Sequence, residues 1–264
     1  MTGLFQESRE GQPTHTGTDN DDVPRLHPLI VEGKLESMCG RFVQDDELNE
    51  LLVNYALDGH RFPDYQPHWN LAPTHTIGLI RTVRTADSRV ERLLGPARWS
   101  LVPPWEKTLT PRYSTFNARA EKVGHTKTFA AALTHQRALI PTGGYYEWVM
   151  ADGVKTPHFI STTADAPLAF AALYSWWQGD DGSSPVCTAT IVTTDAPPSL
   201  SWIHSRIPVF VPESSWDQWL DPSIPGSQEM VDTLVKEQSP ITSGFSAHPV
   251  RSVRGDGPDL VAPV

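Results

Sequence analysis

Cysteine is scarce in this chain of 264 residues, which contains only Cys39 and Cys187. The two lie far apart in the sequence and form no Cys-x-x-Cys pair, so no disulfide framework is expected, and the pattern fits a reducing compartment. No apolar run approaches the roughly 18 residues that a membrane helix needs. The N-terminus has no basic region followed by an apolar stretch, so no secretory signal is expected. The sequence therefore predicts a cytoplasmic protein without membrane contact.

Several common catalytic and cofactor motifs are also absent. The chain has no GxxxxGKS/T, GxGxxG, HExxH or GxSxG, so the P-loop, dinucleotide, zinc-protease and serine-hydrolase sites built on them are not expected. None of the ten histidines pairs with a cysteine or carboxylate at the usual spacing for a metal site. We therefore expect neither a metal nor another cofactor.

Positive charge is in deficit, because 21 Lys and Arg face 31 Asp and Glu, which gives a formal net charge of −10. Taken whole, this balance argues against a nucleic-acid-binding protein, since phosphate contacts need clustered Lys and Arg. The basic residues are unevenly distributed, however. Residues 81–137 contain 11 Lys and Arg against 4 Asp and Glu. One stretch of the chain is therefore distinctly basic, and the sign of the whole chain misleads.

The 24 prolines and 9 tryptophans indicate many short elements rather than a helical bundle. Hydrophobic periodicity and alanine content predict four helices, at 46–57, 127–135, 214–220 and 228–237. Runs of β-branched and aromatic residues bounded by Gly, Pro or Asp predict seven strands, at 77–84, 89–94, 138–148, 157–161, 168–176, 186–193 and 207–211.

This pattern predicts one α+β domain over 38–264, built on a curved antiparallel sheet. Residues 1–37 are rich in Thr, Asp, Gly, Glu and Pro. Such a composition cannot bury enough apolar surface to become ordered, so we expect a disordered N-terminal arm.

Cys39, in the sequence Met-Cys-Gly-Arg-Phe, is the first candidate for chemistry. A lone cysteine is most often a small buried hydrophobic residue, but the preceding Met38 allows a second interpretation. If the chain starts at Met38, or is cleaved after it, Cys39 carries a free α-amine beside its thiol. The ordinary pKa values of these groups, about 8 and about 8.5, leave both partly nucleophilic near neutral pH.

Three further clusters contain residues suited to a reactive site. The segment 117–121 (Asn-Ala-Arg-Ala-Glu) is either a polar turn or a site in which the asparagine positions a reactant and Arg119 grips an anion. Glu147, in Gly-Gly-Tyr-Tyr-Glu-Trp, is either an exposed strand carboxylate or a buried general acid or base. His204 precedes Arg206 by two residues in a segment otherwise poor in basic residues, which modestly favours an anion-facing site over a structural histidine.

Taken together and in this order, these clusters resemble the SRAP family, the SOS response-associated peptidase-like or abasic-site processing proteins. The similarity covers nearly all of 38–264 and includes three further segments: 69–73 (Trp-Asn-Leu-Ala-Pro), 98–105 (Arg-Trp-Ser-Leu-Val-Pro-Pro-Trp) and 260–264 (Leu-Val-Ala-Pro-Val). Each motif alone is weak, but the ordered set is highly specific. The resemblance implies a curved, barrel-like antiparallel β-sheet with flanking helices and a basic DNA groove.

The resemblance also implies a function. Members of the family recognise abasic sites in single-stranded DNA and form a covalent DNA–protein crosslink, which protects the lesion in the DNA damage or SOS response. The implied partner is therefore single-stranded DNA containing an abasic site. We expect a monomer that is associated with the nucleoid when bound to DNA, and the family carries peptidase and lyase labels as well.

The family's site residues can be carried over one by one. Cys39 corresponds to the nucleophile. Asn117 and Glu147 correspond to active-site residues around the sugar, and His204 corresponds to a residue with acid–base work. The resemblance implies six DNA-binding residues, which are Arg41, Arg119 and Arg206 at phosphates and Pro73, Trp105 and Trp148 near the lesion, where they stack on bases or block a duplex strand.

The implied chemistry depends on an N-terminal cysteine. The amine of Cys39 attacks the open-chain aldehyde of an abasic deoxyribose to form a Schiff base, and the thiolate then closes a five-membered thiazolidine. Ring closure is intramolecular and benefits from a high effective concentration. It also diverts the imine from β-elimination, which would break the strand. Glu147 and His204 would move protons during sugar opening, dehydration and ring closure.

The chain departs from the family at its beginning, where 37 residues precede Met38. With a peptide bond upstream, Cys39 has no free amine and cannot form a thiazolidine. Three alternatives stay open: translation that starts at Met38, cleavage that removes the arm, and a persistent arm that leaves a thiol-only protein. A smaller departure is Ser100, where the family often has glycine, and we expect little effect from it.

Two rival functions stay open, and the first would use the same residues. A cysteine peptidase or amidohydrolase, which could act on its own arm, would use Cys39 with Glu147 and His204. A non-covalent reader of damaged or modified DNA would bind equally well after Cys39→Ala and would form no crosslink.

Overall fold

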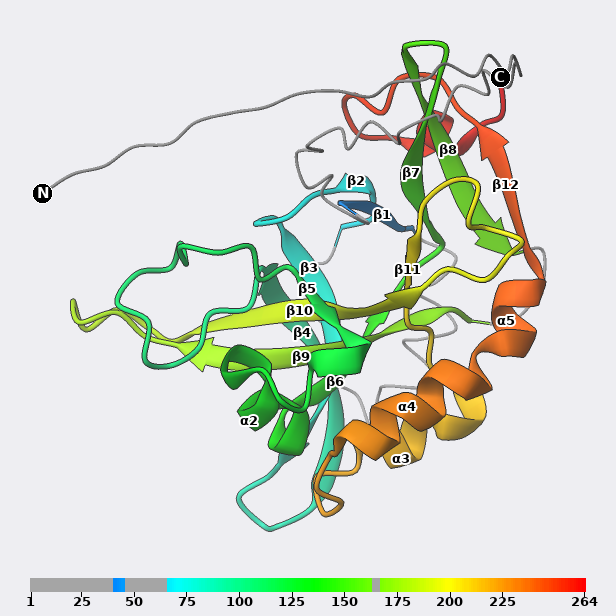
Figure 1. Cartoon of the computed structure of the whole chain (residues 1–264). Helices are drawn as coiled ribbons and strands as arrows, with labels where there is room; N and C mark the ends of the chain where they lie inside the picture. The colour runs from blue at the N-terminus through cyan, green and yellow to red at the C-terminus, as the bar shows by residue number, and fades with distance from the viewer. Residues whose placement is uncertain (1–39, 46–65, 163–166) are drawn as a thin grey trace, which may run out of the picture. The chain divides into compact units, whose positions relative to one another are not determined.

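The computed structural model describes residues 40–45, 66–162 and 167–264 (Figure 1). The chain divides into two units, Met1–Glu36 and Ser37–Val264, and all described residues belong to the second. Three features predicted above lie outside the described residues, namely the arm at 1–37, the helix at 46–57 and Cys39 itself.

Five strands pair in a closed ring. They are β3 (Thr76–Arg84), β4 (Val90–Trp99), β6 (Arg137–Pro141), β9 (Ala169–Trp177) and β10 (Val186–Asp195). The ring closes where Thr188 and Ala189 of β10 pair with Arg98 and Trp99 of β4. This pairing is parallel, whereas the other four are antiparallel. The predicted barrel-like sheet is therefore confirmed, with one parallel seam.

Two short strands attach to the end of β10. β5 (Asn117–Arg119) runs parallel to it, and β11 (Arg206–Pro208) runs antiparallel to it. The two strands share Thr193 as a pairing partner, so the segments that follow β4 and β10 in the chain converge at this end of β10.

The second sheet has five antiparallel strands in the order β12-β8-β7-β1-β2. Its members are β1 (Arg41–Gln44), β2 (His68–Leu71), β7 (Gly144–Ala151), β8 (Val154–Thr162) and β12 (Phe245–Pro249). Phe42 of β1 joins this sheet to the barrel, because its ring lies edge-on to Trp99 at 4.9 Å and to Phe170 at 5.5 Å between centroids.

The prediction of a single strand over 138–148 is wrong, because the chain changes sheets within it. β6 ends at Pro141, and the Thr142 hydroxyl donates to the Val43 carbonyl at 3.0 Å while accepting the Gly144 N–H at 3.1 Å. Gly144 has φ +150°, and a Cβ there would lie 2.6 Å from the Ile160 carbonyl oxygen. A glycine at this position therefore lets the chain leave the barrel and enter β7.

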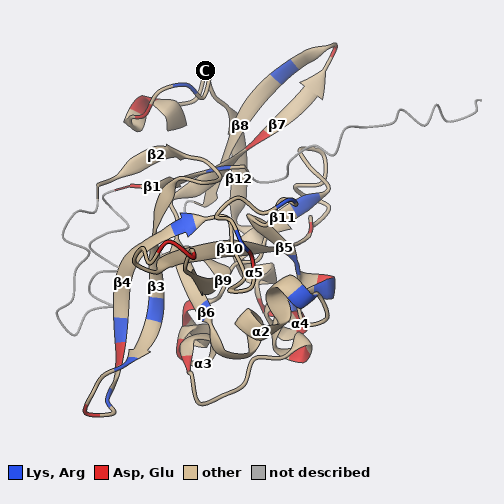
Figure 2. Cartoon of the chain, turned by 90° about the vertical axis from the view of Figure 1, so that its left-hand side faces the viewer, with Lys and Arg blue, Asp and Glu red and all other residues tan. Residues whose placement is uncertain are grey.

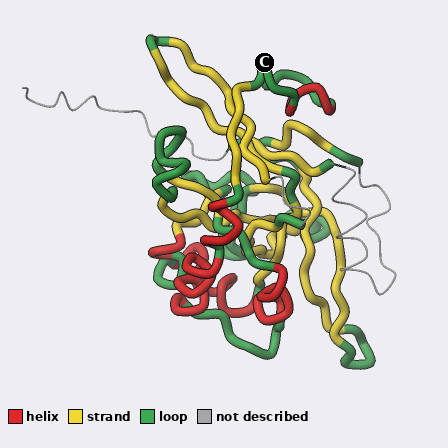
Figure 3. The backbone as a smooth tube through the Cα atoms, turned by 90° about the vertical axis from the view of Figure 1, so that its right-hand side faces the viewer, coloured by secondary structure: helices red, strands yellow, loops and turns green. Residues whose placement is uncertain are grey.

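Helices α2 (Lys127–His135), α3 (Trp216–Leu220) and α4 (Gln228–Glu237) gather against one side of the barrel (Figure 3). Their apolar residues pack against the strands in one hydrophobic cluster. The helices contribute Phe129, Leu133, Trp216, Trp219 and Leu234, and the strands contribute Ile80, Leu94, Leu139 and Leu173. The predictions for α2 and α4 are confirmed, and 214–220 consists of a 3-10 turn (Glu213–Ser215) followed by α3. A short α5 (Ser239–Ser243) follows α4. Among the described residues, no helix is long and apolar enough to cross a membrane.

Arg137, the first residue of β6, ties α2 to α3 from inside the protein. Its side chain is buried, and its guanidinium donates to five carbonyl oxygens, those of Trp219 (2.7 Å), Leu133 (3.2 Å), Thr134 (2.9 Å), Asp221 (2.6 Å) and Ile224 (2.8 Å). These carbonyls lie at the C-terminal ends of the two helices or just beyond them, where backbone acceptors lack partners within the helix.

We expect Arg137→Ala to lower the free energy of unfolding by about 3 kcal/mol or more, because several buried carbonyls lose a charged donor together. Denaturant unfolding followed by tryptophan fluorescence measures this change. Arg84→Ala, an exposed arginine of β3, is the control and should change the value by less than about 0.5 kcal/mol. Equal midpoints for the two variants would contradict this role of Arg137.

Candidate functional site

The position of β1 determines where the chain following Cys39 enters the protein. β1 lies between β2 and β7, with Arg41 opposite Tyr146. Continuing this antiparallel register by one residue places Gly40, which is buried, beside Glu147. Cys39 itself lies outside the described residues. The structure therefore places the residue that follows the predicted nucleophile next to Glu147.

Glu147 is 4% exposed, so it is not an exposed strand carboxylate. It belongs to the buried half of β7, together with Tyr145 and Tyr146, and it pairs in register with His158 of β8. A carboxyl group in such an apolar strand is costly to bury without a specific role. The position suits a group that gives and takes a proton, as general acid–base catalysis requires.

His204 lies on the loop that joins β10 to β11. The backbone N–H of Arg206 donates to His204 Nδ1 at 3.0 Å, so the neutral ring carries its proton on Nε2. Trp202 of the same loop lies edge-on to His158, with 5.4 Å between ring centroids. Because His158 is the register partner of Glu147, this contact brings the loop that bears His204 to the strands that bear Glu147.

Asn117, Arg119 and Arg206 meet at the end of β10. Asn117 pairs with Ile191 and Arg119 with Thr193. Arg206 donates to the Thr193 carbonyl at 2.7 Å from the opposite side of the same strand. The segment 117–121 is therefore a short strand followed by a 3-10 turn, not a simple polar turn. The Arg119 side chain is exposed and available to an anion.

Arg206 is held by two carboxylates that the sequence analysis did not assign to it. Its guanidinium donates to Glu121 at 2.7 and 3.0 Å and to Asp195 at 2.6 Å. Burial alone would lower the pKa of Arg206, but the two carboxylates outweigh it and raise the pKa above its ordinary value. Glu121 is part of the 117–121 cluster that the sequence singled out. Nothing in the sequence marked Asp195. Phosphate binding by Arg206 stays a prediction.

The turn that contains Pro73 contacts the end of β4. Pro73 lies in the turn after β2, where the Thr74 N–H donates to the Trp99 carbonyl at 2.6 Å and Thr74 has φ +78°. The Ser100 hydroxyl lies 3.0 Å from that of Thr115. The serine at this position therefore has a hydrogen-bond partner, and the small effect expected of it stays a prediction.

Trp105 and Trp148 lie on different elements, and each has a lysine over its ring. Trp105 is 49% exposed on the loop after β4, with Lys127 Nζ 5.4 Å from its ring centroid. Trp148 is half-buried and follows Glu147 on β7, with Lys155 Nζ 5.7 Å from its centroid. Trp148 follows Glu147 in β7, so its side chain projects from the opposite face of the strand, where it packs with Tyr146 and Phe159. Trp105 is associated with α2 through Lys127.

Lys and Arg recur along β3 and β4 (Figure 2). Some of these arginines form ion pairs, either within the β3–β4 hairpin or with a neighbouring helix. Arg89 binds Asp87 and Glu91, and Arg92 binds Asp217. In the described ranges of the chain, no group of three or more His, Cys, Asp or Glu side chains is placed to hold a metal ion.

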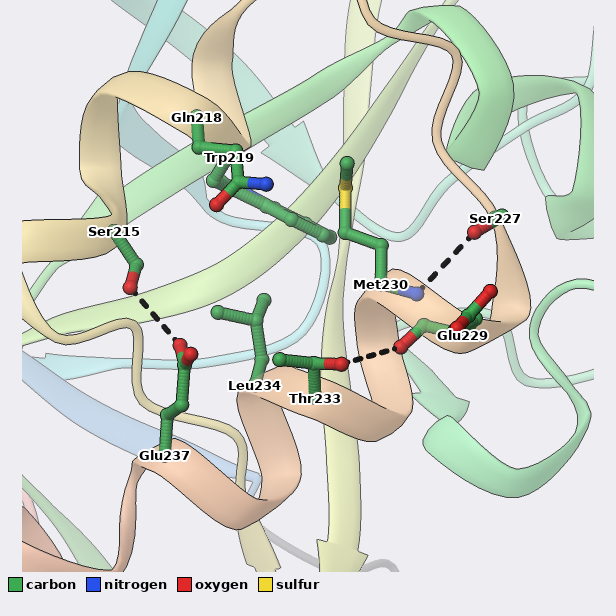
Figure 4. Close-up of a pocket in the computed structure, with 9 residues that line it drawn as sticks. All are labelled: Ser215, Gln218, Trp219, Ser227, Glu229, Met230, Thr233, Leu234 and Glu237. Carbon is green, nitrogen blue, oxygen red and sulfur yellow. Dashed lines mark hydrogen bonds between the residues drawn. The ribbon is translucent and has the colours of Figure 1, made fainter.

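A separate pocket of about 260 Å³ lies between α3 and α4 (Figure 4). Trp219, Met230 and Leu234 contribute apolar surface, and the Ser215 hydroxyl donates to Glu237 at 3.0 Å across its edge. None of the predicted site residues lines this pocket, so we do not place the site there.

Cys187, on β10, is part of the hydrophobic core. It is 6% exposed, and burial raises the pKa of its thiol to about 11, an effect that nearby Arg81 partly offsets. At pH 8 only about one such thiol in a thousand is ionised. We therefore expect iodoacetamide to leave Cys187 unmodified in the folded protein and to modify it in denaturant. Peptide mass spectrometry measures both, and equal labelling would contradict this placement.

The chain matches the family described as SOS response associated peptidase (SRAP) over residues 38–254. It is 35% identical over 188 residues to the Bacillus subtilis "Abasic site processing protein YoaM", and this match covers 70% of this chain and 80% of the relative. It is 28% identical over 240 residues to the Pongo abelii "Abasic site processing protein HMCES", which covers 77% of this chain and 67% of the relative. A crystal structure of a Bacteroides thetaiotaomicron protein shares the fold, with a TM-score of 0.69 at 18% identity over 86% of this chain and 100% of that one.

Proposed function

The chain belongs to the SRAP family, and from this premise we propose that it binds single-stranded DNA at abasic sites and captures the lesion covalently through Cys39. The names of its relatives, abasic site processing proteins, support the substrate class. The proposal requires a free amine on Cys39, and therefore a chain that begins at this residue.

The observation that carries the proposal is the convergence of three segments. The chain following Cys39 enters the second sheet beside buried Glu147. The His158–Trp202 contact brings the loop that bears His204 to the same strands. A nucleophile, a buried carboxyl and an imidazole with a defined tautomer are the components that imine formation and ring closure need.

The proposed reaction balances without an oxidant or reductant. The amine of Cys39 adds to the sugar aldehyde, and loss of one water gives the imine. The thiolate then adds to the imine carbon, the nitrogen takes a proton, and the five-membered ring closes. Glu147 and His204 carry the protons between these steps. Arg41 and Arg119 bind phosphates near the lesion. Arg206 takes the same role when a phosphate replaces Glu121 or Asp195 at its guanidinium.

The side chains expected near the lesion act by shape. Trp148, next to Glu147 on β7, presents a ring on which a base beside the lesion can stack. Pro73 and Trp105 border the path of the DNA strand farther from the lesion. Asn117 of β5, which pairs with Ile191 of β10, holds the sugar.

The proposal is tested with a chain that begins at Cys39 and a single strand containing an abasic site. We expect a species that survives denaturing electrophoresis. The same strand with its aldehyde reduced to an alcohol, and the variant Cys39→Ala, should give none. If folded protein with a confirmed N-terminal Cys39 forms no such species, the proposal is overturned.

A further inference from the structure

A groove of about 460 Å³ opens in the barrel wall where β4 and β10 diverge. The two strands pair only at the parallel seam of Arg98–Trp99 with Thr188–Ala189. The residues that precede the seam, such as Pro96 on β4 and Val186 on β10, face one another across the groove. Pro96 has no N–H and cannot extend the ladder from this edge, which is one physical reason for the opening.

Two arginines line this groove. Arg81 lies over the Tyr174 ring at 5.7 Å and over the Trp176 ring at 5.1 Å. Nη1 of Arg98 is buried, and the described part of the chain gives it no hydrogen-bond partner. Neither guanidinium has a carboxylate partner among the described residues, unlike Arg89 of the same hairpin. Nη1 of Arg98 is therefore a buried donor without an acceptor among the described residues, which favours an anionic ligand.

The groove also offers a flat apolar wall. Trp176 is 40% exposed, which is unusual for a large ring in a strand that is otherwise buried. Leu93, Leu94 and Val186 complete the apolar lining. A nucleobase stacks on an exposed tryptophan, and its phosphate matches a planar guanidinium. An uncharged apolar segment would cover the wall but leave Nη1 of Arg98 without an acceptor.

The groove lies near the loop that bears Trp105, one of the residues expected to bind DNA. The Trp177 indole N–H donates to the Glu106 carbonyl at 2.8 Å, so the end of β9 lies against the loop that bears Trp105. Along β10, Cys187 at the groove is six residues from Thr193 at the candidate site, a distance of roughly 20 Å. The groove is therefore separate from the reacting residues, and Arg81 of β3 and Arg98 of β4 line it.

We propose that this groove is a second subsite for the single strand, in which the base of an unpaired nucleotide stacks on Trp176 and its phosphate binds Arg81 and Arg98. The inference rests on the proposed function, since it needs a bound single strand. It involves none of the residues that react with the lesion.

Binding of a labelled, unmodified single strand, measured by anisotropy over a range of salt concentrations, tests the subsite. For a strand long enough to span site and groove, Trp176→Ala should weaken binding about tenfold, and Trp176→Phe should restore most of the loss. Arg81→Ala should reduce the slope of log affinity against log salt by about 0.7, the value for one phosphate of a single strand. Arg84→Ala removes the same charge from the same strand outside the groove and should change neither quantity.

The outcomes separate this inference from the proposed function. With a short abasic strand that covers the reacting site alone, all four variants should crosslink at the wild-type rate. If Trp176→Ala and Arg81→Ala bind the long strand as wild type does, the subsite is wrong although crosslinking persists. If the unaltered chain from Cys39 never crosslinks but its binding still depends on Trp176, the proposed function fails and the subsite stands. Thermal unfolding shows which variants fold. If Trp176→Ala does not fold, the salt slope of Arg81→Ala decides: a reduced slope supports the subsite, and an unchanged slope contradicts it.

Discussion

A chain that retains residues 1–37 is expected to form no covalent adduct with an abasic strand, whereas the same chain beginning at Cys39 forms one with most of the protein. The reason is that an amide nitrogen carries no nucleophilic lone pair, so a single upstream peptide bond removes the first step of the reaction. The thiol alone cannot replace it, because thiol addition to an aldehyde is reversible and yields no ring. The expected difference is all or none, as it is for Cys39→Ala.

The measurement is denaturing electrophoresis of both chains with the same strand, together with the intact mass of each protein. A chain that bears one alanine before Cys39 is the matched control, since it blocks the amine with the smallest change. The mass also tests whether cleavage removes the arm, in which case the longer chain reacts only after it has lost residues 1–37. An adduct on protein whose mass shows the arm intact would contradict the account.

Glu147→Gln is expected to slow adduct formation by about 100- to 10,000-fold, the usual contribution of a positioned proton-transfer group. The amide keeps the size of the carboxyl in a strand position that is 4% exposed, but it cannot take up and return a proton. The rate of adduct formation at saturating strand measures the effect, and binding of an unmodified strand should change little.

Asp152→Asn is the matched control for this substitution. Asp152 lies at the exposed tip of the β7–β8 hairpin with φ +50°, a conformation that asparagine tolerates. It makes the same chemical change on the same hairpin and should leave the rate unaltered. Equal rates for Glu147→Gln and the unaltered chain would remove Glu147 from the reaction. Equal slowing by both substitutions would assign the effect to charge rather than to the site.

The strands with strong local patterns could be predicted from the sequence, and those without could not. β3, β9 and β10 agree with the predicted ranges to within two residues at each end, because long runs of β-branched and aromatic residues define them. β1, β2, β5 and β12 have three to five residues each and were not predicted. Strands of that length form only because neighbouring strands supply their partners, which no local pattern encodes.

The parallel seam is another feature that local patterns do not carry. Alternation along β4 and β10 is the same whichever direction a neighbour runs, and the direction here follows from where the chain re-enters the barrel. The break between β6 and β7 at Thr142 and Gly143 could not be predicted, for a related reason. The residues around it are apolar and extended on both sides, so the run 138–148 appeared continuous.

For the candidate site, the sequence predicted residue types better than their environment. Burial of Glu147 distinguishes between two interpretations that the sequence left open, and it needed the positions of β1 and β8 to do so. The two carboxylates on Arg206 come from segments 85 and 11 residues away, so no local pattern joined them. The groove at Trp176 depends on the divergence of two strands that are far apart in sequence.

The rival functions give different results in the same experiments. A peptidase that uses Cys39 with Glu147 and His204 would continue to cleave a peptide when the amine of Cys39 is blocked. A non-covalent reader would bind the abasic strand equally well after Cys39→Ala. The covalent account predicts that both changes abolish the adduct while binding of unmodified strand persists.

The most direct test of the central claim is the intact mass of the adduct after treatment with iodoacetamide. If Cys39 forms the thiazolidine, the adduct has the mass of the protein plus the abasic strand less one water. Iodoacetamide then leaves Cys39 unmodified, because the ring occupies both the nitrogen and the sulfur of Cys39. An adduct in which Cys39 is still alkylated would show that the thiol stays free and that no ring has formed. That result, or the absence of any adduct from a chain shown to begin at Cys39, would contradict the account.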